Sequence, residues 1–191
     1  SVRIISAKDN EYPSDIKKLV DFPTFLYVKG NEMHRERKIA VVGTRKVTKF
    51  GKASCEKIVK DLLEYDITIV SGLAEGIDTI ALNIAVQKNN NPIAIVGTGL
   101  DIVYPFENRE IWEKIGREGT IISEYPLGTS AQKWNFPKRN RLIAAISNGV
   151  LVAESFHRGG SLITAELAYS LDKEIFAIPG FINYPSFEGC N

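Results

Sequence analysis

A nine-residue stretch combines side chains that suit an unpaired nucleic-acid strand. It holds four cations, two aromatic rings and two amides, in the order Lys133-Trp134-Asn135-Phe136-Pro137-Lys138-Arg139-Asn140-Arg141. Cations neutralise backbone phosphates, and an aromatic ring offers any free base a stacking surface worth roughly 1–3 kcal/mol. The alternative interpretation is a solvated basic loop, before a helix expected at residues 142–147, with Trp134 or Phe136 buried as its anchor. Composition does not separate the two.

Small residues form a second group of candidates, because they follow several apolar runs that we expect to be strands. These turns are Gly43-Thr44-Arg45, Ser71-Gly72, Gly97-Thr98-Gly99 and Gly159-Gly160-Ser161. Small residues leave backbone N–H groups exposed at helix N-termini, where phosphate binds. A single glycine after a strand is as often only a turn residue, and Ser161 could simply cap a helix. Recurrence at several strand ends favours the functional interpretation.

Positive charge is gathered in two segments, although the formal net charge of the chain is only +1. No acidic residue occurs at 37–55 or at 125–153. The cations of these segments are Arg37, Lys38, Arg45, Lys46, Lys49 and Lys52 in the first, and Lys133, Lys138, Arg139 and Arg141 in the second. Two basic segments in a nearly neutral protein indicate a local anion site rather than a general attraction to nucleic acid.

The elements that must position these residues alternate along the chain. Short apolar, β-branched runs occur at 38–42, 67–71, 92–96, 120–123, 150–153 and 174–178, and amphipathic stretches of helical length occur at 50–65, 77–87 and 162–171. This alternation predicts βαβ units and a mostly parallel sheet covered on both faces. We therefore predict an α/β protein with an extended Rossmann-like, doubly wound sheet, in which ligands bind beyond the carboxyl ends of the strands.

Three segments are expected. Residues 1–36, with a helical stretch at 14–19 and an apolar run at 25–28, should be an N-terminal extension packed on the core. Residues 37–180 should form the Rossmann-like core, and residues 181–191 a C-terminal tail without periodicity.

Several classes of protein are disfavoured. No apolar run approaches the roughly 20 residues of a spanning helix, so no membrane association is predicted. Two cysteines, Cys55 and Cys190, are too few for a disulfide framework, which favours the cytoplasm. The two histidines, His34 and His157, lie far from any cysteine at zinc spacing, so no metal is predicted. With only these two histidines, a Ser-His-Asp or Cys-His catalytic triad is also disfavoured.

Nucleotide-binding motifs are incomplete as well. Gly51-Lys52 is not the end of a Walker A loop, because Lys46 and Ala53 stand where that motif needs Gly and Ser or Thr. Gly97-Thr98-Gly99 lacks a third glycine, since position 102 is Ile102, which makes NAD binding a weak prediction. No cofactor is therefore predicted.

Taken in order, these strings resemble the DNA-processing protein A family (DprA, also called Smf). The matching strings are Val42-Gly43-Thr44-Arg45, residues 71–78, Tyr104-Pro105, Ser123-Glu124, residues 136–141, residues 160–165 and Pro179-Gly180, with Tyr12-Pro13 and residues 26–30 near the N-terminus. The resemblance covers nearly the whole chain. One departure is visible, since Leu82 stands where the family usually has His. Members often continue into a winged-helix-like domain, so a further C-terminal portion beyond residue 191 is expected.

The resemblance implies a non-catalytic protein that binds single-stranded DNA during natural transformation, forms homodimers and helps to load the recombinase RecA. It implies that Arg45 holds a phosphate, that Gly43 and Thr44 shape the pocket floor, and that Ser71 and Gly72 offer further contacts. It implies that Lys133, Arg139 and Arg141 line the pocket, with Phe136 against a base. Asn140 would position the loop, and Gly160 and Ser161 would supply N–H groups.

The main alternative is a nucleotide-binding or nucleotide-hydrolysing protein related to the phosphoribohydrolases. Those enzymes use a Gly-Gly-x-Gly-Thr-x-x-Glu turn, whose Glu does the chemistry. Here Leu167 occupies the Glu position, Glu166 lies one residue short and about 100° away on a helix, and Ile163 replaces Gly. A second alternative is a scaffold whose basic stretch contacts acidic proteins.

Overall fold

Six parallel strands form the centre of an eight-stranded sheet in a computed structural model, which describes residues 1–33 and 37–191. His34 and the domain boundary expected at residue 36 lie outside the described residues. The strand order is β1-β2-β6-β5-β4-β3-β7-β8, and β2 runs antiparallel to both of its neighbours, β1 and β6. The parallel strands are β3 (Lys38–Gly43), β4 (Thr68–Ser71), β5 (Ile93–Ile95), β6 (Thr120–Ser123), β7 (Gly149–Glu154) and β8 (Glu174–Ala177). The predicted mostly parallel, doubly wound fold is confirmed.

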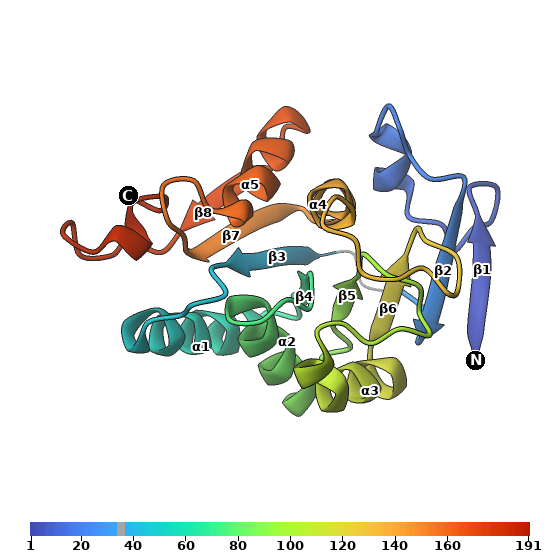
Figure 1. The fold of residues 1–191 in the computed structure, drawn as a ribbon, viewed down its shortest axis with the longest axis horizontal. Helices are drawn as coiled ribbons and strands as arrows, with labels where there is room; N and C mark the ends of the chain where they lie inside the picture. Colours follow the sequence, from blue (N-terminus) through green and yellow to red (C-terminus); the bar gives the residue numbers. More distant parts are fainter. Residues whose placement is uncertain (34–36) are drawn as a thin grey trace.

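Helices cover both faces of this sheet (Figure 1). One face carries α1 (Lys49–Leu63), α2 (Ile77–Gln87) and α3 (Arg109–Glu118), and the other carries α4 (Asn135–Ile146) and α5 (Gly160–Ser170). Apolar side chains of both faces are buried, as expected for strands covered on each side. In the part of the chain that the structure describes, no helix is both long and apolar enough to cross a membrane.

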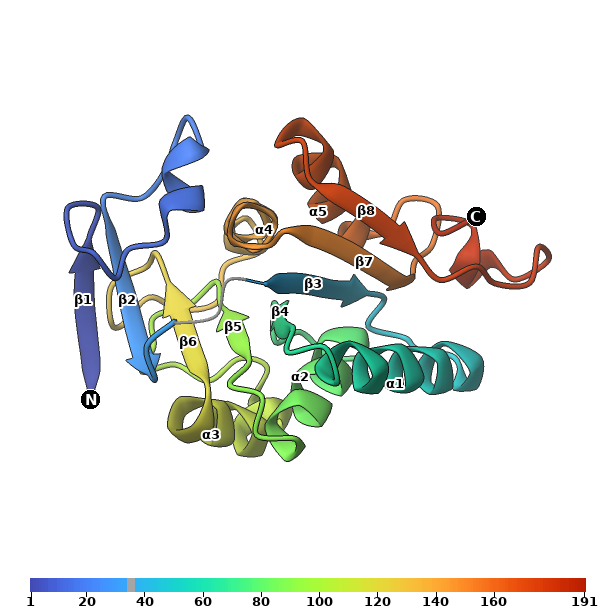
Figure 2. The ribbon, with the colours of Figure 1, turned by 180° about the vertical axis from the view of Figure 1, so that it is seen from behind.

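The N-terminal segment extends the sheet itself. Strand β1 (Val2–Ser6) pairs with β2 (Phe25–Gly30), and β2 pairs antiparallel with β6, as the view from behind shows (Figure 2). Between them, the 3-10 helix η1 (Ser14–Lys18) packs against α4 through the fully buried Ile16. The apolar run at 25–28 therefore becomes a strand of the same sheet, where the sequence indicated only a packed extension.

Two helices differ from the sequence expectation. Helix α4 begins at Asn135 rather than at residue 142, so the basic stretch forms its first turns and not a loop. Helix α3 was not expected because most of its residues are polar, although Ile111, Trp112 and Ile115 bury one narrow side. The edge strand β8 was expected to be covered, but all four of its residues are exposed.

The strand order places the switch point of the sheet between β3 and β7. From β3 the chain proceeds outward through β4, β5 and β6, and then returns to the other side of β3 with β7 and β8. In open α/β sheets, ligands bind in the crevice at this point, outside the carboxyl ends of the strands. We therefore expect a ligand-binding site at the turns after Gly43 and Glu154.

Candidate nucleic-acid interface

A cavity of about 530 Å³ lies at this switch point, between the ends of β3 and β7 and the first turns of α4 and α5. Most of the predicted site residues line it, namely Gly43, Thr44, Arg45, Lys133, Phe136, Arg139, Asn140, Gly160 and Ser161. They come from three separate segments of the chain. Arg45 and Lys133 are exposed at the rim of the cavity, so two cations border the space where a ligand would lie.

Arg141 does not line this cavity, which corrects the sequence expectation. Its Nε donates to Asp21 Oδ2 at 2.8 Å, and its Nη1 and Nη2 donate to the two carboxylate oxygens of Glu124 at 2.9 and 2.8 Å. Two residues along a helix correspond to about 200° of rotation, so Arg139 and Arg141 lie on nearly opposite sides of α4. Arg141 instead joins α4 to the N-terminal segment through Asp21.

Ser71 and Gly72 also lie outside the main cavity. The Ser71 hydroxyl is fully buried and donates to the Val41 carbonyl at 2.6 Å, between neighbouring strands. A Cβ on Gly72 would stand 2.6–2.8 Å from the guanidinium of Arg139, so this glycine makes room for that side chain. Gly72 borders only a small adjoining hollow of about 20 Å³.

Arg139 forms the floor of the cavity. Its side chain donates through Nη1 to the carbonyls of Gly72, at 2.6 Å, and Ile95, and thereby bridges the ends of β4 and β5. The residue is 5% exposed. Burial lowers the pKa of Arg139 to about 10, opposed by the negative charge of Asp78, so the guanidinium stays protonated at neutral pH. It therefore adds positive charge while holding α4 on the sheet.

Asp78 is a cavity residue that the sequence reasoning did not single out. Its Oδ2 accepts from the backbone N–H groups of Gly72 at 3.1 Å and Ala74 at 3.3 Å, which shapes the turn between β4 and α2. Burial raises the pKa of Asp78 to about 6, although the Arg139 charge and these hydrogen bonds act in the opposite direction. The sequence feature that could have singled out Asp78 is an acidic residue in the first turn of a helix. Acidic residues are common at helix N-termini, so this feature does not by itself indicate a site.

The turn carrying Thr44 and Arg45 packs against the loop between β4 and α2. The Ile77 N–H donates to the Thr44 carbonyl at 3.2 Å. Gly76 has a φ of +79°, and a Cβ there would overlap the Thr44 carbonyl oxygen and the Arg45 backbone. The close approach of these two turns fixes the backbone from which Arg45 reaches the cavity.

The N-termini of α1 and α5 differ in what occupies them. At α1, the fully buried Glu154 accepts from the Thr48 N–H at 3.0 Å and from its hydroxyl at 3.2 Å. A carboxylate thus fills the place where dinucleotide-binding Rossmann folds put pyrophosphate. At α5, the first turn holds no acid, and among the described residues no heavy atom lies within 4 Å of where a Cβ on Gly160 would stand. The α5 terminus is therefore the one open to an anion.

Aromatic rings form one side of the cavity. Phe136 packs against Tyr104 with ring centroids 5.3 Å apart and planes tilted by 31°. Phe156, directly after Ser155 at the end of β7, also lines the cavity and is exposed. Tyr104 and Phe156 were not predicted as site residues. The Tyr104-Pro105 pair contributed to the family resemblance, but the resemblance assigned no function to Tyr104. Cations and exposed rings around one hollow suit a polyanion with stacking bases.

The raised pKa of Asp78 makes a prediction about stability. Its ordinary pKa is 3.8 and its folded-state pKa about 6, so the folded protein binds more protons between these values. The contribution of Asp78 to the free energy of unfolding is therefore full below pH 3.8 and is lost as the pH rises through about 6. Between about pH 5 and about pH 7 the wild-type protein should lose about 1 kcal/mol relative to Asp78→Asn. Urea unfolding at both pH values measures this difference, and parallel pH curves would contradict it.

Among the described residues, no group of three or more His, Cys, Asp or Glu side chains could hold a metal ion. The groups that border the cavity are the cations Arg45, Lys133 and Arg139, the N-terminus of α5 and the rings of Phe136 and Tyr104.

Known proteins share this arrangement of sequence and fold. The DNA processing protein DprA of Streptococcus pneumoniae is 44% identical over 187 residues, which are 97% of this chain and 66% of that protein. Protein Smf of Synechocystis is 39% identical over 98% of this chain and 48% of its own length. The chain thus spans about half to two thirds of the curated relatives it matches.

Solved structures agree. The S. pneumoniae DprA structure matches all of this chain and 67% of that one with a TM-score of 0.95 at 43% identity. A Helicobacter pylori DprA structure, described as showing a unique single-stranded DNA binding mode, matches 97% of this chain and 84% of that one with a TM-score of 0.89 at 30% identity. A molybdenum cofactor binding protein of Rippkaea orientalis, with a TM-score of 0.56 at 14% identity, shares the fold alone.

A family model described as DNA recombination-mediator protein A matches residues 3–191. Since this match spans nearly the whole chain, and the sheet, the switch point and the relatives agree with it, the chain belongs to the DNA recombination-mediator protein A family.

Proposed function

We propose that this chain binds one unpaired DNA strand in the switch-point cavity and acts as a non-catalytic mediator. The observation that carries the proposal is the meeting of Arg45, Lys133 and the open α5 terminus with the Phe136 and Tyr104 rings around one hollow. Cations and N–H groups would hold phosphates, and Phe136 would contact a base. A duplex would bind less well, because its bases are paired and not free to stack.

The described binding mode of the H. pylori relative supports single-stranded DNA as the ligand. We extend the proposal to DNA uptake in natural transformation, to loading of RecA onto single-stranded DNA, to action as a homodimer and to a cytoplasmic location. These parts depend on family membership rather than on the cavity itself.

The nucleotide-hydrolase alternative has less support. Glu154 fills the α1 terminus, where a nucleotide phosphate would bind in a dinucleotide-binding fold. Glu166 is exposed on α5 at the position next to the one that the hydrolase turn requires, and Leu167 occupies that position. Incubation with AMP-like nucleotides tests the alternative, since release of free base would favour an enzyme.

The main experiment compares an unpaired oligonucleotide with the matching duplex. Fluorescence anisotropy at two salt concentrations should show tighter binding of the unpaired strand, with a log–log salt slope of roughly −0.7 for each phosphate contact. Equal affinity for both forms would contradict the proposal. Competition by a heparin-like polyanion without preference for unpaired DNA would favour a scaffold that contacts acidic partners.

A further inference from the structure

Trp134 is an exposed indole beside the cavity with no assigned role. Trp134 is 71% exposed, which excludes the alternative interpretation that it is buried as an anchor of the basic stretch. Its neighbours Lys133, Phe136 and Pro137 all line the cavity, but Trp134 itself does not. Single exposed apolar side chains are ordinary on protein surfaces. The position of this ring, rather than its exposure alone, is what calls for an explanation.

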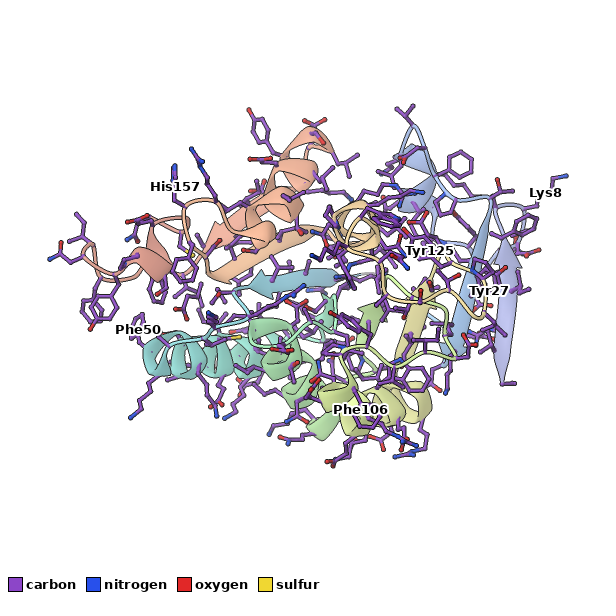
Figure 3. All side chains as sticks on the ribbon, in the orientation of Figure 1. Lys8, Tyr27, Phe50, Phe106, Tyr125 and His157 are labelled. Atoms are coloured by element: carbon purple, nitrogen blue, oxygen red, sulfur yellow. The ribbon has the colours of Figure 1, made fainter. Side chains whose placement is uncertain are left out.

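Trp134 caps the start of α4 in a helical conformation, which decides the side on which it lies. Residues four apart share one side of a helix, so Trp134 lies above Lys138. The Lys138 ammonium lies 6.0 Å from the Tyr125 ring centroid and 3.6 Å from a carboxylate oxygen of Glu124, and none of these three residues lines the cavity. Figure 3 shows Tyr125 on one side of α4 and His157, which follows the cavity residue Phe156, on the other.

A strand longer than the cavity must pass over some part of its rim, and the start of α4 is one part. A hollow of about 530 Å³ has the size of a site for one small ligand, so most nucleotides of a longer strand would lie outside it. The first turn of α4 carries no acid, and Lys133 and Lys138, both exposed, flank Trp134. Lys133 therefore offers positive charge next to an exposed aromatic ring, whereas Lys138 shares its charge with Glu124 at 3.6 Å, and a cation beside an exposed ring suits a phosphate chain carrying unpaired bases.

We infer that Trp134 stacks on a base of the unpaired strand just outside the cavity, where the strand passes over the start of α4, an inference that rests on the proposed DNA binding. The site accepts any base, since every base has a π face. It lengthens the interface from the cavity toward the Tyr125 side of α4.

Intrinsic fluorescence offers a direct test, because the chain has two tryptophans. Trp112 is buried on α3 under Lys29, whose ammonium lies 3.9 Å from its ring centroid. A thymidine oligonucleotide of about 16 nucleotides should quench Trp134 emission, whereas one of about 2 nucleotides, short enough to stay in the cavity, should not. Anisotropy of the same end-labelled strands reports binding independently. In Trp134→Ala the remaining Trp112 emission should not respond to either strand.

Affinity provides the second readout. Trp134→Ala should bind the long strand about tenfold more weakly, because one stacking contact is worth roughly 1–3 kcal/mol, and should bind the short strand as the wild type does. The salt slope should not change, because stacking releases no counterions. Tyr169→Ala is the matched control, since that ring is equally exposed but lies in the last turn of α5, about 14 Å along the helix from its start.

The outcomes separate the two proposals. Long-strand binding without quenching, or an equal loss for both strands in Trp134→Ala, would overturn the role of Trp134 and leave DNA binding in the cavity intact. Failure of the wild-type protein to bind either strand would overturn both.

Discussion

Replacing Arg45 or Lys133 with Ala should each weaken single-strand binding about tenfold, since hydrogen bonds to charged groups contribute roughly 1.5–3 kcal/mol. Both side chains are exposed at the cavity rim and come from different segments, so their effects should be nearly additive. Each change should also reduce the magnitude of the log–log salt slope by roughly 0.7, because one phosphate contact is lost. Anisotropy titrations at several salt concentrations measure both quantities.

A matched control separates this effect from a change in net charge. Lys88 is an exposed cation between the end of α2 and the start of β5, on the side of the amino ends of the parallel strands, whereas the cavity lies at their carboxyl ends. Lys88→Ala removes the same charge and should leave affinity and slope nearly unchanged. Unchanged slopes in both Arg45→Ala and Lys133→Ala would place the DNA elsewhere.

Replacing Arg139 with Ala should lower the free energy of unfolding by about 3–5 kcal/mol, because a buried acceptor left without its donor costs roughly 1–3 kcal/mol and this change affects two carbonyls. The change leaves the carbonyls of Gly72 and Ile95 without this donor and leaves Asp78 without the positive charge that faces it. Since small domains are stable by only about 5–15 kcal/mol, the loss is a large fraction of the total. Urea unfolding followed by circular dichroism measures it.

Two further variants test the role of Arg139 even if Arg139→Ala does not fold. Arg139→Lys retains the positive charge but replaces the planar guanidinium with a differently shaped ammonium, so it should lose less stability than Ala. Arg117→Ala removes an exposed arginine from the last turn of α3 and should change stability by less than about 0.5 kcal/mol. A loss below about 1 kcal/mol in Arg139→Ala would show that the buried guanidinium does not hold α4 on the sheet.

Local pattern predicted most of the core. The parallel strands β3 to β8 lie within a residue or two of the apolar runs, and α2 has the predicted bounds. The pattern did not predict elements that bury few side chains. Strand β1 buries only Ile5, and α3 buries only Ile111, Trp112 and Ile115. The pattern also failed at α4, where the Lys and Arg side chains of the first turns concealed a helix start.

Apolar runs and helical periodicity are local properties, so the amino-acid sequence alone predicted where most strands end and that small, cationic and aromatic residues follow them. Which of these residues share the cavity depends on contacts between distant segments of the chain. Arg139 and Arg141 belong to one motif, yet packing of α4 buries the first beneath the cavity and turns the second toward Glu124. Desolvation and pairing of Asp78 likewise depend on neighbours distant along the chain, which no spacing within the motif encodes.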